Sequence, residues 1–169
     1  MGVKLLALMA AGAMLIPSVA TSAELDFTWG DADKFTDIES GDENRTRFRQ
    51  RIAEGFEQIF QQNAEQLPSD QTLKVTITNV DLAGHVDMSG TERLRIVQRG
   101  HPPMVSFSYE LLDADGNSLA SGEERLRGRS AGSSASRTQR GSQSLLTHER
   151  EMLNDWFRET FDDAFDMDN

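Results

Sequence analysis

The chain has 169 residues, and its 28 acidic and 17 basic side chains give a net charge of −11 near pH 7. An acidic surface of this size argues against non-specific binding of nucleic acid and against docking onto anionic lipid. Because the chain contains no cysteine, disulfides, thiolate catalysis, cysteine-ligated metals and lipid attachment at a cysteine are excluded.

The N-terminus has the pattern of a bacterial secretory signal peptide. Lys4 supplies a positive charge, residues 5–20 form an apolar run, and small residues at 21–23 precede a cleavage point. A transmembrane anchor is the alternative, but the run is short for a bilayer span. We therefore predict that residues 1–23 are cleaved, with a cut after Ala20 as the other option. The predicted location is the periplasm, or else the extracellular space, with no membrane insertion after cleavage.

The remaining 146 residues suit one domain, which we predict over residues 24–165. Alternating apolar residues predict a short strand at 25–29. A capping-box pattern begins at Ser40, with Glu43 three residues later, and predicts a helix that ends near residues 67–68. The apolar stripe of this helix consists of Phe48, Ile52, Phe56, Ile59 and Phe60.

A series of strands follows. Alternation predicts strands at 73–78, 93–97 and 105–111, and in the second of these Leu94 and Ile96 mark the apolar face. We interpret residues 85–90 as a polar loop and residues 100–103 as a rigid corner that contains two prolines. A turn at 113–117 leads to a hairpin partner at 118–126.

The C-terminal part contains a loop and a helix. Residues 127–144 are rich in Gly, Ser and Arg and predict a flexible loop, whereas residues 166–169 form an acidic tail. Between them, the segment that contains Leu145, Glu149, Met152 and Trp156 predicts a second amphipathic helix, with Trp156 as its anchor. The predicted fold class is α+β: a two-layer sandwich in which two amphipathic helices cover one face of a mostly antiparallel sheet of four or five strands.

The order of several short segments resembles the DUF3016 family of small exported proteins from Gram-negative bacteria. The segments are residues 34–38 (KFTDI), 80–84 (VDLAG), 95–97 (RIV), 101–103 (HPP), 121–123 (SGE) and 152–157 (MLNDWF), together with the strand around Tyr109 and the turn at Gly116. The chain departs from the family at 30–33, where a proline is expected, and at Arg127, where an aspartate is expected. The resemblance covers the whole mature chain and implies export and fold; the family has no established activity.

Four residues are candidates for a binding site: Asp81, Arg93, Arg95 and His101. If helices cover one sheet face only, Arg93 and Arg95 project from the open face, opposite Leu94 and Ile96. Asp81, at the end of its strand, is either a turn residue or a site residue, and as a site residue it could pair with Arg95 or hold it for a ligand carboxylate. Ordinary cross-strand charge pairs on a solvated face are the simpler interpretation of this pattern.

Metal chemistry is the alternative to ligand binding. Asp81, His85 and Asp87 could ligate a metal, although their spacing fits no closed motif. A metal-assisted hydrolase would use Asp81, His85 and His101. Asp113, Asp115, Asn117 and Glu124 partly follow a calcium loop, but the glycine is misplaced and a hairpin turn explains them better. The chain has no G-x-S-x-G, HExxH or phosphate-loop motif.

The sequence therefore favours a non-catalytic binding or accessory module of the cell envelope. We expect an envelope protein as its partner, no catalytic residues, no cofactor and no resident metal. The sequence does not determine an oligomeric state.

Overall fold

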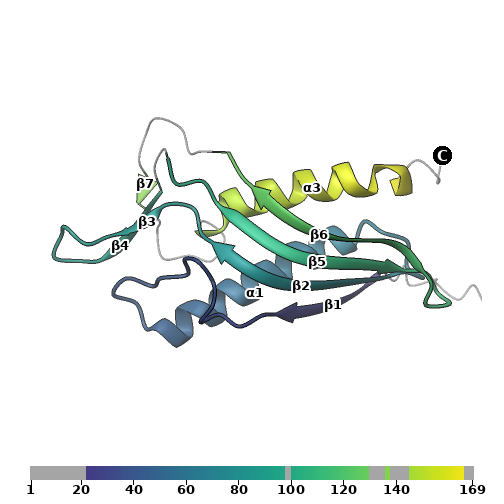
Figure 1. The fold of residues 1–169 in the computed structure, drawn as a ribbon, viewed down its shortest axis with the longest axis horizontal. Coiled ribbons are helices and arrows are strands. Elements are labelled where there is room, and N and C mark those ends of the chain that lie inside the picture. The colour runs from purple at the N-terminus through teal and green to yellow at the C-terminus, as the bar shows by residue number, and fades with distance from the viewer. Residues whose placement is uncertain (1–21, 98–99, 130–135, 138–144, 166–169) are drawn as a thin grey trace, which may run out of the picture.

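The computed structural model describes residues 22–97, 100–129, 136–137 and 145–165. The elements in chain order are β1 (Glu24–Trp29), α1 (Arg45–Ala64), β2 (Thr72–Asp81), β3 (His85–Asp87), β4 (Leu94–Val97), β5 (Met104–Leu112), β6 (Ser118–Arg127), β7 (Ser136–Arg137) and α3 (Thr147–Phe165). The fold is α+β (Figure 1). None of the helices within these residues is both long and apolar enough to cross a bilayer. Nearly all of the predicted signal peptide (1–21) and the acidic tail (166–169) lie outside the described residues.

The main sheet has four strands in the order β1-β2-β5-β6. β1 pairs with β2 in parallel, and α1 forms the crossover between them, while β2, β5 and β6 are antiparallel. Figure 1 shows α1 and α3 on the same side of this sheet, behind the strands. The sheet is therefore mixed, so the prediction of a mostly antiparallel sheet is only approximately correct.

The core lies between the sheet and the two helices. The alternating residues Leu73, Val75 and Ile77 of β2 are all buried, as are Val105, Phe107 and Leu111 of β5. They pack against the predicted stripe of α1 (Phe48, Ile52, Phe56, Ile59 and Phe60) and against the apolar residues of α3, including Leu153, Trp156 and Phe157. The period-two and period-3.6 patterns thus identified the buried faces of these elements correctly.

The strands do not all belong to one sheet, which corrects a prediction. β3, β4 and β7 form a separate three-stranded sheet in the order β3-β4-β7. β3 lies within the predicted polar loop 85–90, and β7 lies within the predicted flexible loop 127–144. Residues 130–135 and 138–144 of that loop fall outside the described part of the chain.

The predicted N-cap of the first helix is wrong. Asn44 caps α1, because its side chain accepts a hydrogen bond from the Arg47 amide. Residues 40–43 instead form a turn against β4, in which the amide of Asp42 donates to the Arg93 carbonyl at 3.1 Å. Gly41 (φ +61°) lies so close to that carbonyl that a Cβ would be 2.0 Å from its oxygen. Residues 40–43, which the local capping pattern assigned to the start of the helix, are held in this tertiary contact instead.

Candidate functional site

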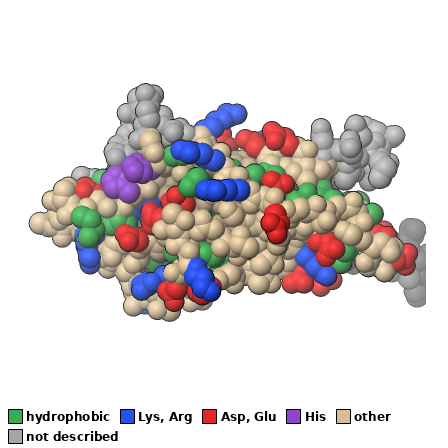
Figure 2. Space-filling model, in the orientation of Figure 1, with side chains coloured by type: hydrophobic (Ala, Val, Ile, Leu, Met, Phe, Trp, Pro, Cys, Tyr) green, Lys and Arg blue, Asp and Glu red, His purple; other side chains and the backbone are tan. Residues whose placement is uncertain are grey.

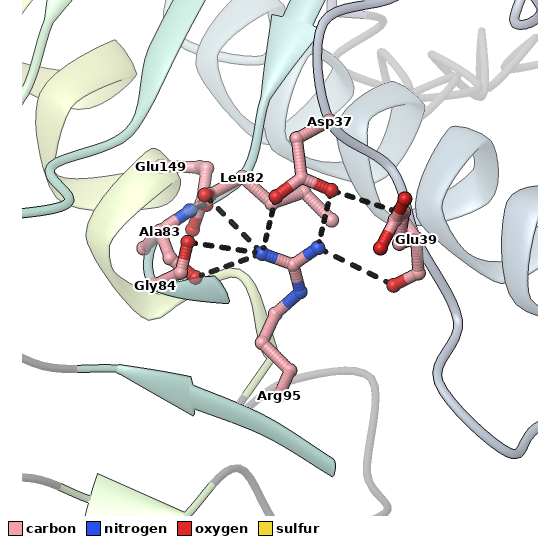
Figure 3. Close-up of polar contacts among 7 residues, drawn as sticks. All are labelled: Asp37, Glu39, Leu82, Ala83, Gly84, Arg95 and Glu149. Atoms are coloured by element: carbon pink, nitrogen blue, oxygen red, sulfur yellow. Dashed lines mark hydrogen bonds and ion pairs between the residues drawn. The ribbon is translucent and has the colours of Figure 1, made fainter. Parts of the chain in front are cut away.

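A buried ion pair lies where the main sheet meets the small sheet. The side chain of Arg95, in β4, is only 5% exposed and forms a two-pronged contact with the carboxylate of Asp37. Arg95 Nη2 donates to Asp37 Oδ1 at 2.7 Å, and Nη1 donates to Oδ2 at 3.1 Å. Figure 3 shows the guanidinium at the centre of this cluster. We call Asp37, Arg95, Glu149 and the backbone around them the arginine junction.

Backbone carbonyls complete the surroundings of the guanidinium. Arg95 Nη1 also donates to the carbonyls of Leu82, Ala83 and Gly84 at 3.3–3.4 Å, and Nη2 donates to the Glu39 carbonyl at 3.3 Å. Carbonyls gather here because β2 ends in a tight turn at Gly84 (φ +81°). A buried cation needs such acceptors to offset its desolvation.

Asp37 reaches the junction through strand-like pairing with the end of β2. It forms a parallel bridge with Asp81, in which its amide donates to the Val80 carbonyl at 3.0 Å and its carbonyl accepts from the Leu82 amide at 3.0 Å. After β1 the chain thus leaves the sheet over residues 30–36 and then returns to the edge of β2. The segment that carries Asp37 is fixed by backbone bonds before its side chain meets Arg95.

Glu149, in the first turn of α3, contributes a second carboxylate to the junction. Glu149 is fully buried, and its Oε1 accepts a hydrogen bond from the Ala83 amide at 2.8 Å. Its Oε2 has no hydrogen-bond partner among the described residues. Burial raises the pKa of Glu149 to about 7, although the Ala83 amide and the charge of Arg95 act in the opposite direction. Glu149 therefore exchanges a proton near neutral pH.

Asp81 and Arg95, two of the predicted binding residues, lie close together, but not as a direct pair. The ion-pair partner of Arg95 is Asp37, and Asp81 acts on the cluster through its charge. Burial is the largest cause that raises the pKa of Asp81; the neighbouring charge of Asp37 adds to it, and Arg95 and His101 oppose it. Asp81 is also part of β2, where it pairs with Met104 in β5.

Arg93 and His101 lie outside the junction. Arg93 forms an exposed ion pair with Asp42, with 2.7 Å between Nε and Oδ1. It borders a groove of about 450 Å³ whose walls include Phe35, Arg49 and Met88. The His101 carbonyl accepts from the Gly84 amide at 2.9 Å, and its ring centroid is 4.9 Å from that of His85.

The prediction that Arg93 and Arg95 project from the open face of the main sheet is wrong. β4 belongs to the small sheet, and its buried residues are Arg95 and Val97, whereas Leu94 and Ile96 are only partly buried. Burial in β4 is thus the inverse of the predicted pattern. The contacts of Arg95 join distant segments of the chain, and ligand binding by Asp81, Arg93, Arg95 and His101 stays a prediction.

Two members of the junction, Asp37 and Glu149, were not predicted as site residues. Glu149 had a signal in the sequence, because it is a charged residue at a core position of an apolar helical stripe. Asp37 is 58 residues from Arg95, and no local pattern connects them.

The metal hypotheses gain no support from the geometry. Within the described residues, no group of three or more histidine and carboxylate side chains is arranged to hold a metal ion. This includes Asp81, His85 and His101. In the hairpin, Asp113 Oδ1 accepts from the amides of Asp115 and Asn117, as in an ordinary turn. Glu124 lies far along β6, opposite Phe107.

Comparisons with known proteins place the chain in a family. No curated protein matches it. Among solved structures, the PelC dodecamer from Paraburkholderia phytofirmans is similar to 81% of this chain and 89% of its own chain, at 14% identity and a TM-score of 0.28. The model of a family described as a protein of unknown function, DUF3016, matches residues 23–159, which is most of the chain. The chain therefore belongs to the DUF3016 family.

Proposed function

We propose that the protein is exported to the periplasm and acts there as a non-catalytic binding module that engages an envelope protein. The observation that carries this proposal is the uncovered face of the main sheet. Both helices lie on one side of the sheet, and the described residues place no element on the other side (Figure 1).

The open face is polar and dominated by small hydroxyl side chains. A row runs across the sheet from Thr28 through Thr76 to Ser108 and ends at Glu123. Lys74 and Glu110 lie opposite each other in the next row, with their charged groups 3.9 Å apart. Figure 2 shows this side of the molecule, with acidic and basic groups scattered among uncharged side chains and backbone. Such a surface suits a polar protein interface with hydrogen bonds and bridging water.

In-cell cross-linking tests the proposal. A photoreactive amino acid replaces Thr76, in the middle of the open face, and in a matched control it replaces the exposed Glu57 on α1. We expect the Thr76 variant, expressed at its native level, to cross-link to one envelope protein after illumination of intact cells, and the Glu57 variant to give no such product. Recovery of the Thr76 variant only as a monomer, or recovery of both variants from the cytoplasm, contradicts the proposal.

A further inference from the structure

β1 is an edge strand of the main sheet, and alternate backbone groups along it face outward. The amides of Glu24 and Gly30 donate to the carbonyls of Gln71 and Ile77 at 3.0 and 3.1 Å, and these bonds are six residues apart on both strands. In a parallel pair, every second residue directs both its N–H and its C=O towards the neighbouring strand. The N–H and C=O groups of the intervening residues Leu25, Phe27 and Trp29 therefore point away from β2.

The same three residues have incompletely buried side chains. Leu25, Phe27 and Trp29 are only partly buried, whereas their neighbours Leu73, Val75 and Ile77 on β2 are completely covered. Phe27 and Trp29 face α1, with ring centroids 5.9 Å from Phe60 and 5.5 Å from Phe56. The edge thus combines backbone groups that have no partner among the described residues with apolar surface that one more strand can cover.

The two edges of the sheet differ in how they are protected. β6, at the opposite edge, carries exposed charges at Glu123, Arg125 and Arg127. It also has a register irregularity in its pairing with β5. Charges and irregularities of this kind discourage strand addition. β1 is regular in its pairing with β2 and has no proline or glycine, and its exposed charges are Glu24 and Asp26. The β1 edge is therefore the one that is open to a further strand.

We propose that the β1 edge binds the β1 edge of a second copy of this chain, antiparallel, with the two-fold axis at Phe27. In this register Phe27 faces Phe27 of the second copy, and Leu25 faces Trp29. Every outward N–H and C=O of the three residues then finds a partner. The apolar side chains of the two copies lie together on the helix side of the joined sheet. The contact is isologous and closed, so it gives a dimer rather than a fibre.

Charge and length favour this register over its neighbours. On the other side of the sheet it places Asp26 opposite Thr28, and Glu24 opposite Gly30. A shift of the axis to Asp26 brings two aspartates face to face, which is unfavourable. A shift to Thr28 leaves the outward groups of Leu25 without a strand partner. The six-residue strand thus complements itself in one arrangement.

The contact is short, so the dimer is weak. An interface built on one pair of short strands falls below about 1,200 Å², at the small end of specific interfaces. We expect a dissociation constant on the order of micromolar. This inference goes beyond the proposed envelope partner and does not depend on it, because it concerns the purified protein alone.

Substitutions at Thr28 test the register, because Thr28 is exposed and faces Asp26 of the second copy. Sedimentation equilibrium of the purified protein measures the dissociation constant. Two symmetric pairs change per dimer, so we expect Thr28→Arg to lower the dissociation constant about tenfold and Thr28→Glu to raise it by a similar factor. The matched changes Thr78→Arg and Thr78→Glu, at an exposed position on the inner strand β2, leave it unchanged.

A cysteine experiment gives an independent readout, since the natural chain has none. Asp26 and Thr28 of opposite copies form a non-hydrogen-bonded pair with Cα atoms about 4.5 Å apart, which a disulfide can bridge. Mixing Asp26→Cys with Thr28→Cys under mild oxidation should give the mixed dimer in preference to either homodimer, whose positions are about 7–8 Å apart. A protein that stays monomeric up to about 1 mM, three orders of magnitude above the expected dissociation constant, overturns the proposal. Equal cross-linking of all combinations also overturns it.

Discussion

The pKa of Glu149 makes the stability of the fold depend on pH in a direction that one substitution reveals. Below pH 4.5, the ordinary pKa of this group, Glu149 is neutral in both the folded and the unfolded chain. Between pH 4.5 and about 7 the unfolded chain loses this proton, while the folded chain keeps it because burial disfavours the charge. The unfolded state then binds fewer protons, so the contribution of Glu149 to stability falls as pH rises.

The magnitude follows from the two pKa values. Each pKa unit corresponds to about 1.4 kcal/mol, and the pKa rises from 4.5 to about 7, so the penalty is about 3 kcal/mol above pH 7. Glu149→Gln removes the titration and keeps an oxygen that can accept from the Ala83 amide. We therefore expect the free energy of unfolding of Glu149→Gln, relative to that of the wild type, to rise by about 3 kcal/mol between pH 4.5 and pH 8.

Urea unfolding, followed by the fluorescence of Trp29 and Trp156, measures this difference at several pH values. Other titrating groups, including Asp81, are present in both proteins and cancel in the comparison. Glu151→Gln, an exposed change on the same helix, should show no such dependence on pH. A wild-type to Glu149→Gln difference that is constant from pH 4.5 to pH 8 refutes the reasoning, because it means that Glu149 titrates alike in both states.

Three further predictions concern other parts of the molecule. Arg95→Met should lower the free energy of unfolding by about 3–5 kcal/mol, since it leaves a partly buried carboxylate unpaired. By contrast, Arg93→Met breaks an exposed pair and should cost at most about 1 kcal/mol; similar losses in both proteins, measured by urea unfolding, contradict this. Asp113→Ala should lower the melting temperature through lost turn hydrogen bonds, and calcium should leave the melting temperature of the wild type unchanged. Of the two cleavage points considered, the structure favours the one after Ala20 over the one after Ala23, because Ala23 is buried in the core at 2% exposure and a cut after it removes that packing; mass spectrometry of the exported protein should show the cut after Ala20.

The sequence predicted the helices, the main strands and the core because each is specified by a local repeat. In α1 and in β2 and β5, apolar residues recur at the period of the element, and the buried faces agree with the structure. The pairing of the strands is not local in this sense. β1 is parallel to β2 because α1 carries the chain back across the sheet, and alternation alone gives the same pattern for either direction.

The arginine junction could not be predicted, because the hydrophobic pattern of β4 indicates the wrong buried face. β4 is a strand of four residues, and alternation within it distinguishes two faces without saying which one is buried. Hydrophobicity assigns Leu94 and Ile96 to the inside. The structure buries Arg95 instead, since Asp37 and several carbonyls from distant segments provide the acceptors that a buried guanidinium needs. The decisive partners come from elsewhere in the chain.

The contacts of the junction determine where a partner can bind. The guanidinium of Arg95 donates to acceptors from two separate segments, the residues after β1 and the turn after β2, and so holds them together. A ligand that bound the Arg95 guanidinium would have to break these hydrogen bonds and unfold this end of the sheet. We therefore expect a partner to bind at surfaces that the junction positions without sharing its groups: the open sheet face, the β1 edge and the groove beside Arg93. Because the residues whose backbone groups point outward at the β1 edge lie neither on the open face nor in the groove beside Arg93, a dimer through β1 would leave both of these surfaces free for a partner.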